Sequence, residues 1–139
     1  ATKNAIDEKW LKDHKHIPGG LRRGRMFMNS PQIFMFALRK VPLLINQVLT
    51  KNNVKFDQID NFVLHQANGQ MLEFIRKRLK IPREKFFMNI ENVGNTVSAT
   101  IPIALKDMVD AKKIEKDNKL FLGGFGIGYS WGGTIINVK

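Results

Sequence analysis

One histidine, one asparagine and a glycine-rich segment are the parts of this sequence whose residue types and positions could do chemistry. His65 follows a short apolar run that we interpret as a buried strand and precedes a predicted helix, and ligands bind at such strand ends in open α/β sheets. Asn95 lies between Gly94 and a predicted helix start, while Gly126 and Gly128 lie in the glycine-rich segment. Taken singly, each feature has a plain alternative: a structural histidine, a helix cap and a tight turn.

The three features become more specific because they occur in one order with one spacing. The segments are His65-Gln66-Ala67-Asn68, then Gly94-Asn95-Thr96 with Ala99-Thr100-Ile101-Pro102, then Gly124-Phe125-Gly126-Ile127-Gly128-Tyr129-Ser130-Trp131-Gly132. Together they resemble the C-terminal half of the β-ketoacyl-acyl-carrier-protein synthase III family, within the thiolase superfamily. The resemblance runs from about Met28 to Val138. An asparagine rather than a second histidine after Gly94 separates the sequence from the synthase I and II families.

The resemblance implies a ping-pong Claisen condensation of an acyl-CoA with malonyl-acyl-carrier protein. It maps His65 and Asn95 to the histidine and asparagine of a Cys-His-Asn site, where both would donate hydrogen bonds to a negative thioester oxygen. The backbone N–H of Ile127 would correspond to a donor of the oxyanion hole. The sequence contains no cysteine. We therefore expect the nucleophile to come from an N-terminal half and this chain alone to be inactive.

The resemblance also assigns substrate-binding positions. Phe34 matches an aromatic residue that lines the substrate tunnel, with core packing as the alternative. Asn68 matches a position facing the pantetheine tunnel, with helix capping as the alternative. Gly126 belongs to the glycine loop of the active site. The substrates implied are a coenzyme A thioester and the phosphopantetheine of acyl-carrier protein, and no cofactor is expected.

The sequence is strongly basic, with a net charge of +11 and a pI near 10.1. Such a charge favours partners that are polyanions. Lys77 and Arg78 fall on positions that are basic in the family and face the acidic carrier protein, so the resemblance implies docking there. A solvated helix C-terminus, where cations complement the helix dipole, is the alternative. The local basic cluster comprises Arg76, Lys77, Arg78, Lys80, Arg83 and Lys85.

Two rival functions stay open. The first is another Cys-His-Asn acyltransferase with a specialised product, for which Ser30, in place of a family glycine, and Ile127 leave room. The second is a basic nucleic-acid-binding module, which the charge permits although no recognised nucleic-acid motif is present. Gln70 replaces an arginine often used to dock the carrier protein, which bears on the docking assignment.

The sequence gives little support for a metal-binding site or a membrane-spanning segment. His14 and His16 are two potential ligands without a further cluster, so no metal site is predicted. No apolar run approaches the roughly 20 residues that span a bilayer. We expect a cytoplasmic protein without a membrane partner.

The spacing of apolar residues predicts the elements that must position these side chains. One helix should be capped by Ser30 with Pro31 in its first position, and Pro42 inside it predicts a kink or a break. A second helix should be capped by Asn68, and a third should cover 96–112. Predicted strands cover residues 59–64, 86–90, 119–122 and 130–138, and the glycine-rich segment joins the last two.

Alternating helices and strands indicate an α/β protein in which helices cover a mixed sheet. With the resemblance, we expect half of a thiolase-like fold: a mixed sheet of about four or five strands, packed on a similar N-terminal half and forming a homodimer. Residues 1–27 are predicted to be an arm or loop region, and residues 28–139 the C-terminal domain.

Overall fold

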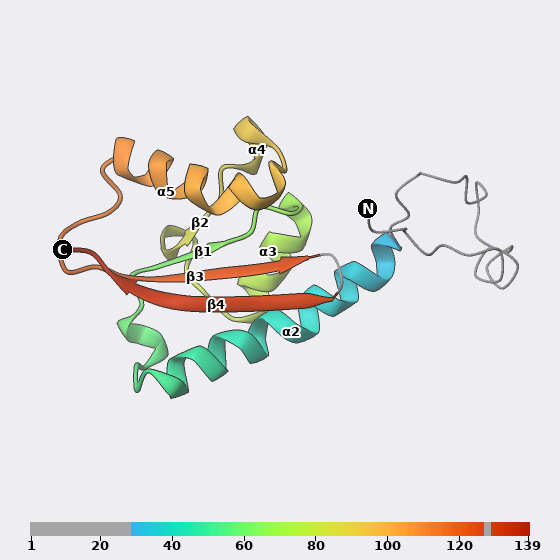
Figure 1. The fold of residues 1–139 in the computed structure, drawn as a ribbon, viewed down its shortest axis with the longest axis horizontal. Coiled ribbons are helices and arrows are strands. Elements are labelled where there is room, and N and C mark those ends of the chain that lie inside the picture. The colour runs from blue at the N-terminus through green and yellow to red at the C-terminus, as the bar shows by residue number, and fades with distance from the viewer. Residues whose placement is uncertain (1–28, 127–128) are drawn as a thin grey trace, which may run out of the picture. The chain divides into compact units, whose positions relative to one another are not determined.

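Four strands form one mixed sheet in the order β2-β1-β3-β4 (Figure 1). The structure is a computed structural model that describes residues 29–126 and 129–139, so the predicted arm at 1–27 lies outside the described residues. Strand β1 pairs in parallel with β2 and β3, and β4 is antiparallel to β3. The prediction of a mixed sheet is confirmed. In chain order the elements are α2 (Ser30–Lys51), η1 (Phe56–Gln58), β1 (Asn61–Leu64), α3 (Gly69–Arg78), η2 (Arg83–Lys85), β2 (Phe86–Phe87), α4 (Ile90–Val93), η3 (Val97–Ala99), α5 (Thr100–Asp110), β3 (Lys119–Gly126) and β4 (Ser130–Asn137).

Helices cover both faces of the sheet because successive residues of a strand point to opposite faces. Phe62 and Leu64 of β1 share one core cluster with residues of α2 and α3. Val63, between them, packs with Ala104 and Met108 of α5 in a second cluster. Figure 1 shows α2 and α5 on opposite sides of the sheet. The arrangement is therefore three layers, helix on sheet on helix.

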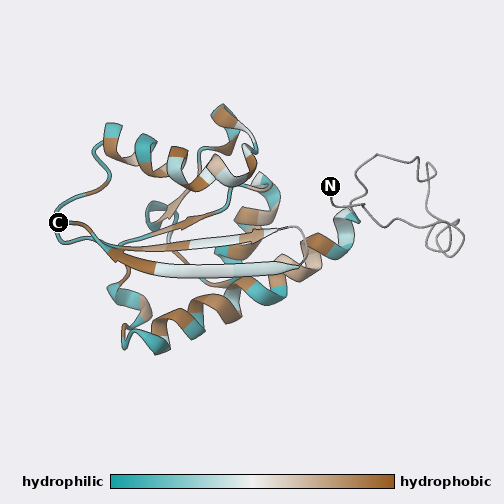
Figure 2. Cartoon of the chain, viewed as in Figure 1, coloured by the Kyte–Doolittle hydropathy of each residue, from teal (hydrophilic) through white to brown (hydrophobic). Residues whose placement is uncertain are grey.

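Helix α2 runs without interruption through Pro42, so the predicted break does not occur. It begins at Ser30, one residue earlier than the cap assignment implied. An interior proline costs a helix roughly 3 kcal/mol, but apolar residues on both sides of Pro42 are buried against the sheet, and this packing holds the helix together. Figure 2 shows apolar and polar residues alternating along α2. The buried residues are Ala37, Val41, Leu44, Ile45 and Leu49.

By length and composition alone, α2 could cross a membrane, which corrects the expectation that no segment qualifies. The core helix of a soluble protein passes the same test. Here Val41 and Ile45 are completely buried in the cluster beneath the sheet, so at least one face of α2 serves the protein core.

Helix α3 forms as predicted from its cap. The side chain of Asn68 accepts a hydrogen bond of 3.1 Å from the backbone N–H of Met71, which satisfies one of the free donors at the helix start. Leu72 and Ile75 are buried on the sheet side. Three cations occupy the last turn, where they complement the helix dipole.

Strand β2 and helix α5 are shorter than predicted. The expected strand at 86–90 keeps only two residues, because the backbone N–H of Asn89 bonds to the Gln66 side chain instead of to a strand. The expected helix at 96–112 begins at Thr100, after a 3-10 turn. That turn starts with Val97 at a φ of 56°, with its N–H bonded to the Asn95 side chain. Side-chain acceptors therefore end the strand and delay the helix.

The glycine-rich segment is mostly strand, which corrects its assignment as a connection. Strand β3 continues to Gly126, and its ladder with β4 includes the pairs Gly123–Gly133 and Gly124–Gly132. A Cβ atom on Gly123 would lie 2.7 Å from Leu64 Cδ2, so a side chain there would collide with β1. Because Gly123 has no side chain, large apolar side chains such as that of Leu64 can fill the space next to it.

Candidate active site

His65 lies where β1 ends, at the same edge of the sheet as the end of β3. Its backbone N–H donates to the carbonyl oxygen of Gly123 at 2.8 Å, which extends the β1–β3 ladder by one bond. The parallel strands β1, β2 and β3 all end at this edge, at Leu64, Phe87 and Gly126. The predicted location of the histidine at a strand end is confirmed by this geometry.

The imidazole of His65 is held on two sides. Its Nδ1 lies 2.6 Å from Oγ1 of Thr100, the first residue of α5. The ring of Phe125, from β3, meets the imidazole edge to face with 5.6 Å between the ring centres. Burial lowers the pKa of His65 below its ordinary value of 6.5, because a charged ring would lose hydration. The side chain is therefore a neutral imidazole near pH 7.

The Asn95 side chain is fixed at both ends of its amide. Its Nδ2 donates to the carbonyl oxygen of Ala67 at 3.2 Å, and its Oδ1 accepts the N–H of Val97 at 2.9 Å. Gly94, at a φ of 74°, makes the sharp turn out of α4 that delivers Asn95 to this position. An amide nitrogen carries two hydrogens, so one of them is left for another acceptor.

A closed circuit of hydrogen-bond contacts joins the two predicted catalytic residues. From His65 it runs through Thr100 Oγ1 to the carbonyl oxygen of Val97 at 3.1 Å, and Val97 N–H bonds Asn95. From Asn95 it returns through Ala67, whose N–H donates to the His65 carbonyl oxygen at 2.8 Å. The structure therefore brings His65 and Asn95 into one network, although 30 positions separate them in the chain.

The Gln66 side chain holds the backbone next to His65 in place, and the sequence did not lead us to predict this role. It is buried, and its Nε2 donates to the carbonyl oxygens of Leu64 at 2.8 Å and Phe87 at 3.4 Å. Its Oε1 accepts the N–H of Asn89. The side chain thus ties the ends of β1 and β2 together under His65. The sequence signal for this role was a glutamine directly after a histidine at a strand end.

The predicted substrate-binding residues lie in different surroundings. Phe34 packs against the core, with its ring edge to face against Phe74 at 5.8 Å. Asn68 is exposed at the start of α3 and lines a cavity of about 770 Å³ between α3 and α4. Gly126 ends β3, half-buried, opposite Ser130 of β4. Ile127 lies outside the described residues.

The basic cluster divides into paired and exposed cations. Arg76 makes two hydrogen bonds to Glu73, at 2.6 and 2.9 Å, and one to the carbonyl oxygen of Ile81. The side chain of Lys77 is 68% exposed and only 3.6 Å from the same carboxylate, and Arg78 is also exposed. The Arg76 hydrogen bond lowers the pKa of Glu73 to about 2. The exposed members of the cluster are Lys77, Arg78, Lys80 and Arg83, which include the two predicted docking residues.

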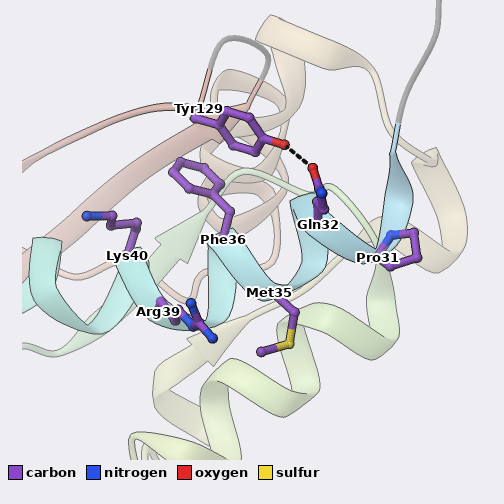
Figure 3. Close-up of a pocket in the computed structure, with 7 residues that line it drawn as sticks. All are labelled: Pro31, Gln32, Met35, Phe36, Arg39, Lys40 and Tyr129. Atoms are coloured by element: carbon purple, nitrogen blue, oxygen red, sulfur yellow. Dashed lines mark hydrogen bonds between the residues drawn. The ribbon is translucent and has the colours of Figure 1, made fainter. Parts of the chain in front are cut away.

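A second cavity, of about 560 Å³, lies beside the N-terminal part of α2 (Figure 3). It is lined by residues of the first turns of α2 and by Tyr129, whose hydroxyl donates to Gln32 Oε1 at 3.0 Å. None of the predicted site residues lines it. Within residues 29–126 and 129–139, no group of three or more potential metal ligands occurs, and His14 and His16 lie outside that part of the chain.

Comparison with known proteins decides the family. A family model described as 3-oxoacyl-[acyl-carrier-protein (ACP)] synthase III C terminal matches residues 49–138. The chain belongs to this family. The β-ketoacyl-[acyl-carrier-protein] synthase III of Porphyra umbilicalis is 41% identical to it over 120 residues, which are 86% of this chain and 36% of that protein.

Solved synthase structures share the fold. The synthase III of Thermus thermophilus has a TM-score of 0.81 and 33% identity, over 88% of this chain and 39% of that one. The 3-oxoacyl-(acyl-carrier protein) synthase of Burkholderia xenovorans LB400 has a TM-score of 0.82 and 32% identity, over 92% and 36%. This chain therefore spans only a little more than a third of the length of these relatives. The expected thiolase-like half fold is confirmed, and the nucleic-acid-binding alternative gains no support.

Proposed function

We propose that the complete protein condenses an acyl-CoA with malonyl-acyl-carrier protein, and that this domain supplies the two side-chain donors of the active site. A cysteine thiol from an N-terminal half takes the acyl group and releases coenzyme A. Malonyl thioester then loses CO₂, and the remaining carbanion attacks the acyl-cysteine carbonyl carbon. The cysteine thiolate leaves, and 3-oxoacyl-carrier protein is formed.

The roles of His65 and Asn95 follow from where negative charge develops. Loss of CO₂ places charge on the malonyl thioester oxygen, and preorganised N–H donors stabilise it without reorganising during the reaction. The neutral imidazole and the spare hydrogen of the Asn95 amide are two such donors. The observation that carries the proposal is that the contacts of His65 with Thr100, and of Asn95 with Ala67 and Val97, hold both side chains at one edge of the sheet.

Carrier docking is proposed at the C-terminal end of α3. Lys77 and Arg78 are exposed there, while Asn68 lines the cavity at the other end of the same helix. A helix of ten residues is about 15 Å long, so a carrier bound at the cations would need a prosthetic arm of about that reach. An acidic carrier protein with a phosphopantetheine arm has both properties. A homodimeric assembly in the cytoplasm completes the proposal.

The proposal is tested by supplying the complete protein with acyl-CoA and malonyl-acyl-carrier protein. Mass spectrometry should detect a covalent acyl-enzyme and then 3-oxoacyl-carrier protein, with CO₂ released in equal amount. This chain alone should form no acyl-enzyme, because it contains no cysteine. Acyl transfer to a different acceptor, without CO₂ release, would instead support a specialised acyltransferase and overturn the proposed condensation.

A further inference from the structure

The Thr100 hydroxyl lies between two hydrogen-bond partners at the start of α5. Its side chain is almost fully buried, with 3% of the residue exposed. Oγ1 is 2.6 Å from Nδ1 of His65 and 3.1 Å from the carbonyl oxygen of Val97. A hydroxyl has one hydrogen, so it can donate to only one of these partners.

The choice of partner decides what His65 can do. If the hydroxyl donates to Nδ1, the neutral imidazole carries its hydrogen on Nε2 and is a donor there. If the hydroxyl donates to Val97, Nδ1 must carry the hydrogen and donate to Oγ1. Nε2 then presents a lone pair and is an acceptor or a base.

The two distances favour donation to the histidine. Bonds from O–H donors to oxygen are about 2.5–3.0 Å long, and bonds from N–H donors are about 2.7–3.2 Å. The Thr100–His65 contact of 2.6 Å is shorter than bonds from N–H donors to oxygen usually are. The Thr100–Val97 contact of 3.1 Å is longer than a typical O–H bond to oxygen.

We propose that Thr100 is a positioning residue that donates its hydroxyl hydrogen to Nδ1 of His65 and thereby fixes the Nε2–H tautomer. The inference rests on the proposed function for its catalytic meaning, since a donor at Nε2 is what a developing oxyanion requires. Burial keeps the ring neutral, and only a neutral ring has a tautomer to fix. Thr100 also anchors the ring to α5, so that the helix start sets the direction of the imidazole.

The tautomer is measured directly by NMR of the complete protein labelled with ¹⁵N-histidine. The ring signals of His65 are those that disappear in the His65→Gln variant. We expect Nε2 to bear the hydrogen and Nδ1 to have the chemical shift of a bare nitrogen that accepts a bond. A protonated Nδ1 in the neutral ring would overturn the inference, and this measurement requires neither a Thr100 variant nor enzyme activity.

Variants of Thr100 give a second readout in the same spectrum. Thr100→Val removes the hydrogen that Nδ1 accepts, so the Nδ1 signal should move toward that of a nitrogen that accepts no hydrogen bond, and the share of the Nε2–H tautomer should fall. Thr100→Ser should keep the parent spectrum. An unchanged Nδ1 signal in the folded Thr100→Val protein would overturn the inference. Thr50→Val, on the exposed end of α2, is the matched control.

The kinetic consequence separates this inference from the proposed function. Thr100→Val should lower the rate of malonyl decarboxylation about ten- to hundredfold, as expected for a displaced catalytic group, and Thr100→Ser should recover most of it. Unchanged decarboxylation in Thr100→Val would overturn the positioning role. If the parent protein decarboxylates nothing, the proposed function fails, while the NMR result still decides the tautomer.

Discussion

The Asn95 amide donates a hydrogen bond of 3.2 Å to the carbonyl oxygen of Ala67, two residues after His65. The N–H of the same alanine bonds the His65 carbonyl oxygen at 2.8 Å. The backbone turn that follows His65 therefore also accepts the hydrogen bond from the Asn95 side chain. A shift of one side chain changes the support of the other, so the two donors are expected to act as a unit.

Removing either donor should cripple malonyl decarboxylation by the complete protein. His65→Ala and Asn95→Ala should each lower the rate roughly a hundred- to thousandfold, because one oxyanion donor is typically worth about 3 to 4 kcal/mol. The double variant should be little slower than the worse single variant, since groups that act together are not additive. Release of CO₂ from malonyl-carrier protein is the measurement.

The same series contains its own controls. Acylation of the cysteine by acyl-CoA should suffer less, because backbone N–H groups are proposed to hold that oxyanion. Asn92→Ala, at an exposed position of α4, removes a nearby asparagine amide and should leave decarboxylation unchanged. A folded Asn95→Ala protein that decarboxylates at the parent rate would reduce Asn95 to a residue that shapes the turn before α5.

Much of the fold could be predicted from local patterns. The apolar run of β1 and the Asn68 cap of α3 are each contained in a short stretch of the chain, and the structure has both a buried β1 and this cap. The strand-end location of His65 followed from the same reading. These features depend on contacts within a few residues or on a periodicity that the chain itself displays.

Features that depend on contacts between distant segments could not be predicted. The uninterrupted α2 requires the sheet that buries both sides of Pro42. The glycine run of β3 looks like a loop until Gly123 is seen to lie against Leu64. The contact of Thr100 with His65 joins a helix start to a strand end 35 positions away. In each case the decisive partner is far along the chain.

Reversing charge at the end of α3 should weaken carrier docking. In the complete protein, Lys77→Glu combined with Arg78→Glu should raise the apparent KM for malonyl-carrier protein while hardly affecting acyl-CoA, because charges at the rim of an interface act mainly on encounter. The effect should decline with added salt. Steady-state kinetics with each substrate varied in turn gives the two constants.

A charge-matched control is available on the opposite side of the sheet. Lys112→Glu combined with Lys116→Glu changes the net charge equally, at exposed positions after α5. It should leave the KM for malonyl-carrier protein near the parent value. Equal increases for both substrates, or an equal increase in the control, would assign Lys77 and Arg78 to general solvation.

A side chain at position 123 should destabilise the sheet beneath the active site. The Cβ atom of Gly123→Ala would lie 2.7 Å from Leu64 Cδ2 and 2.9 Å from Phe121 Cε1, and both side chains are buried. Overpacking of this kind costs about 1–3 kcal/mol. Gly132→Ala, where a Cβ atom meets nothing within 4 Å, is the matched control. Denaturant unfolding should show a clear loss only for Gly123→Ala, and equal stability of both variants would refute the steric argument.

The ion pair of Glu73 and Arg76 should contribute to stability in one pH window. Arg76 hydrogen bonding holds the pKa of Glu73 at about 2, against an ordinary value of 4.5. A carboxylate whose pKa is lower in the folded state stabilises the fold above its unfolded pKa, and this contribution is lost as the pH falls from about 4.5 toward 2. The pair is partly exposed, with 33% of the Glu73 side chain accessible, so solvent screening keeps the effect small.

Glu73→Gln should therefore lower the thermal unfolding midpoint by a small, constant amount above pH 5, and this difference should shrink as the pH falls below 4.5. Glu115→Gln, at an exposed position after α5, removes one carboxylate outside this ion pair and is the matched control. A difference that persists undiminished toward pH 2 would show that the charge on Glu73 is not its source, and equal midpoints at every pH would show that Arg76 stabilises the helix end through Ile81 rather than through the carboxylate.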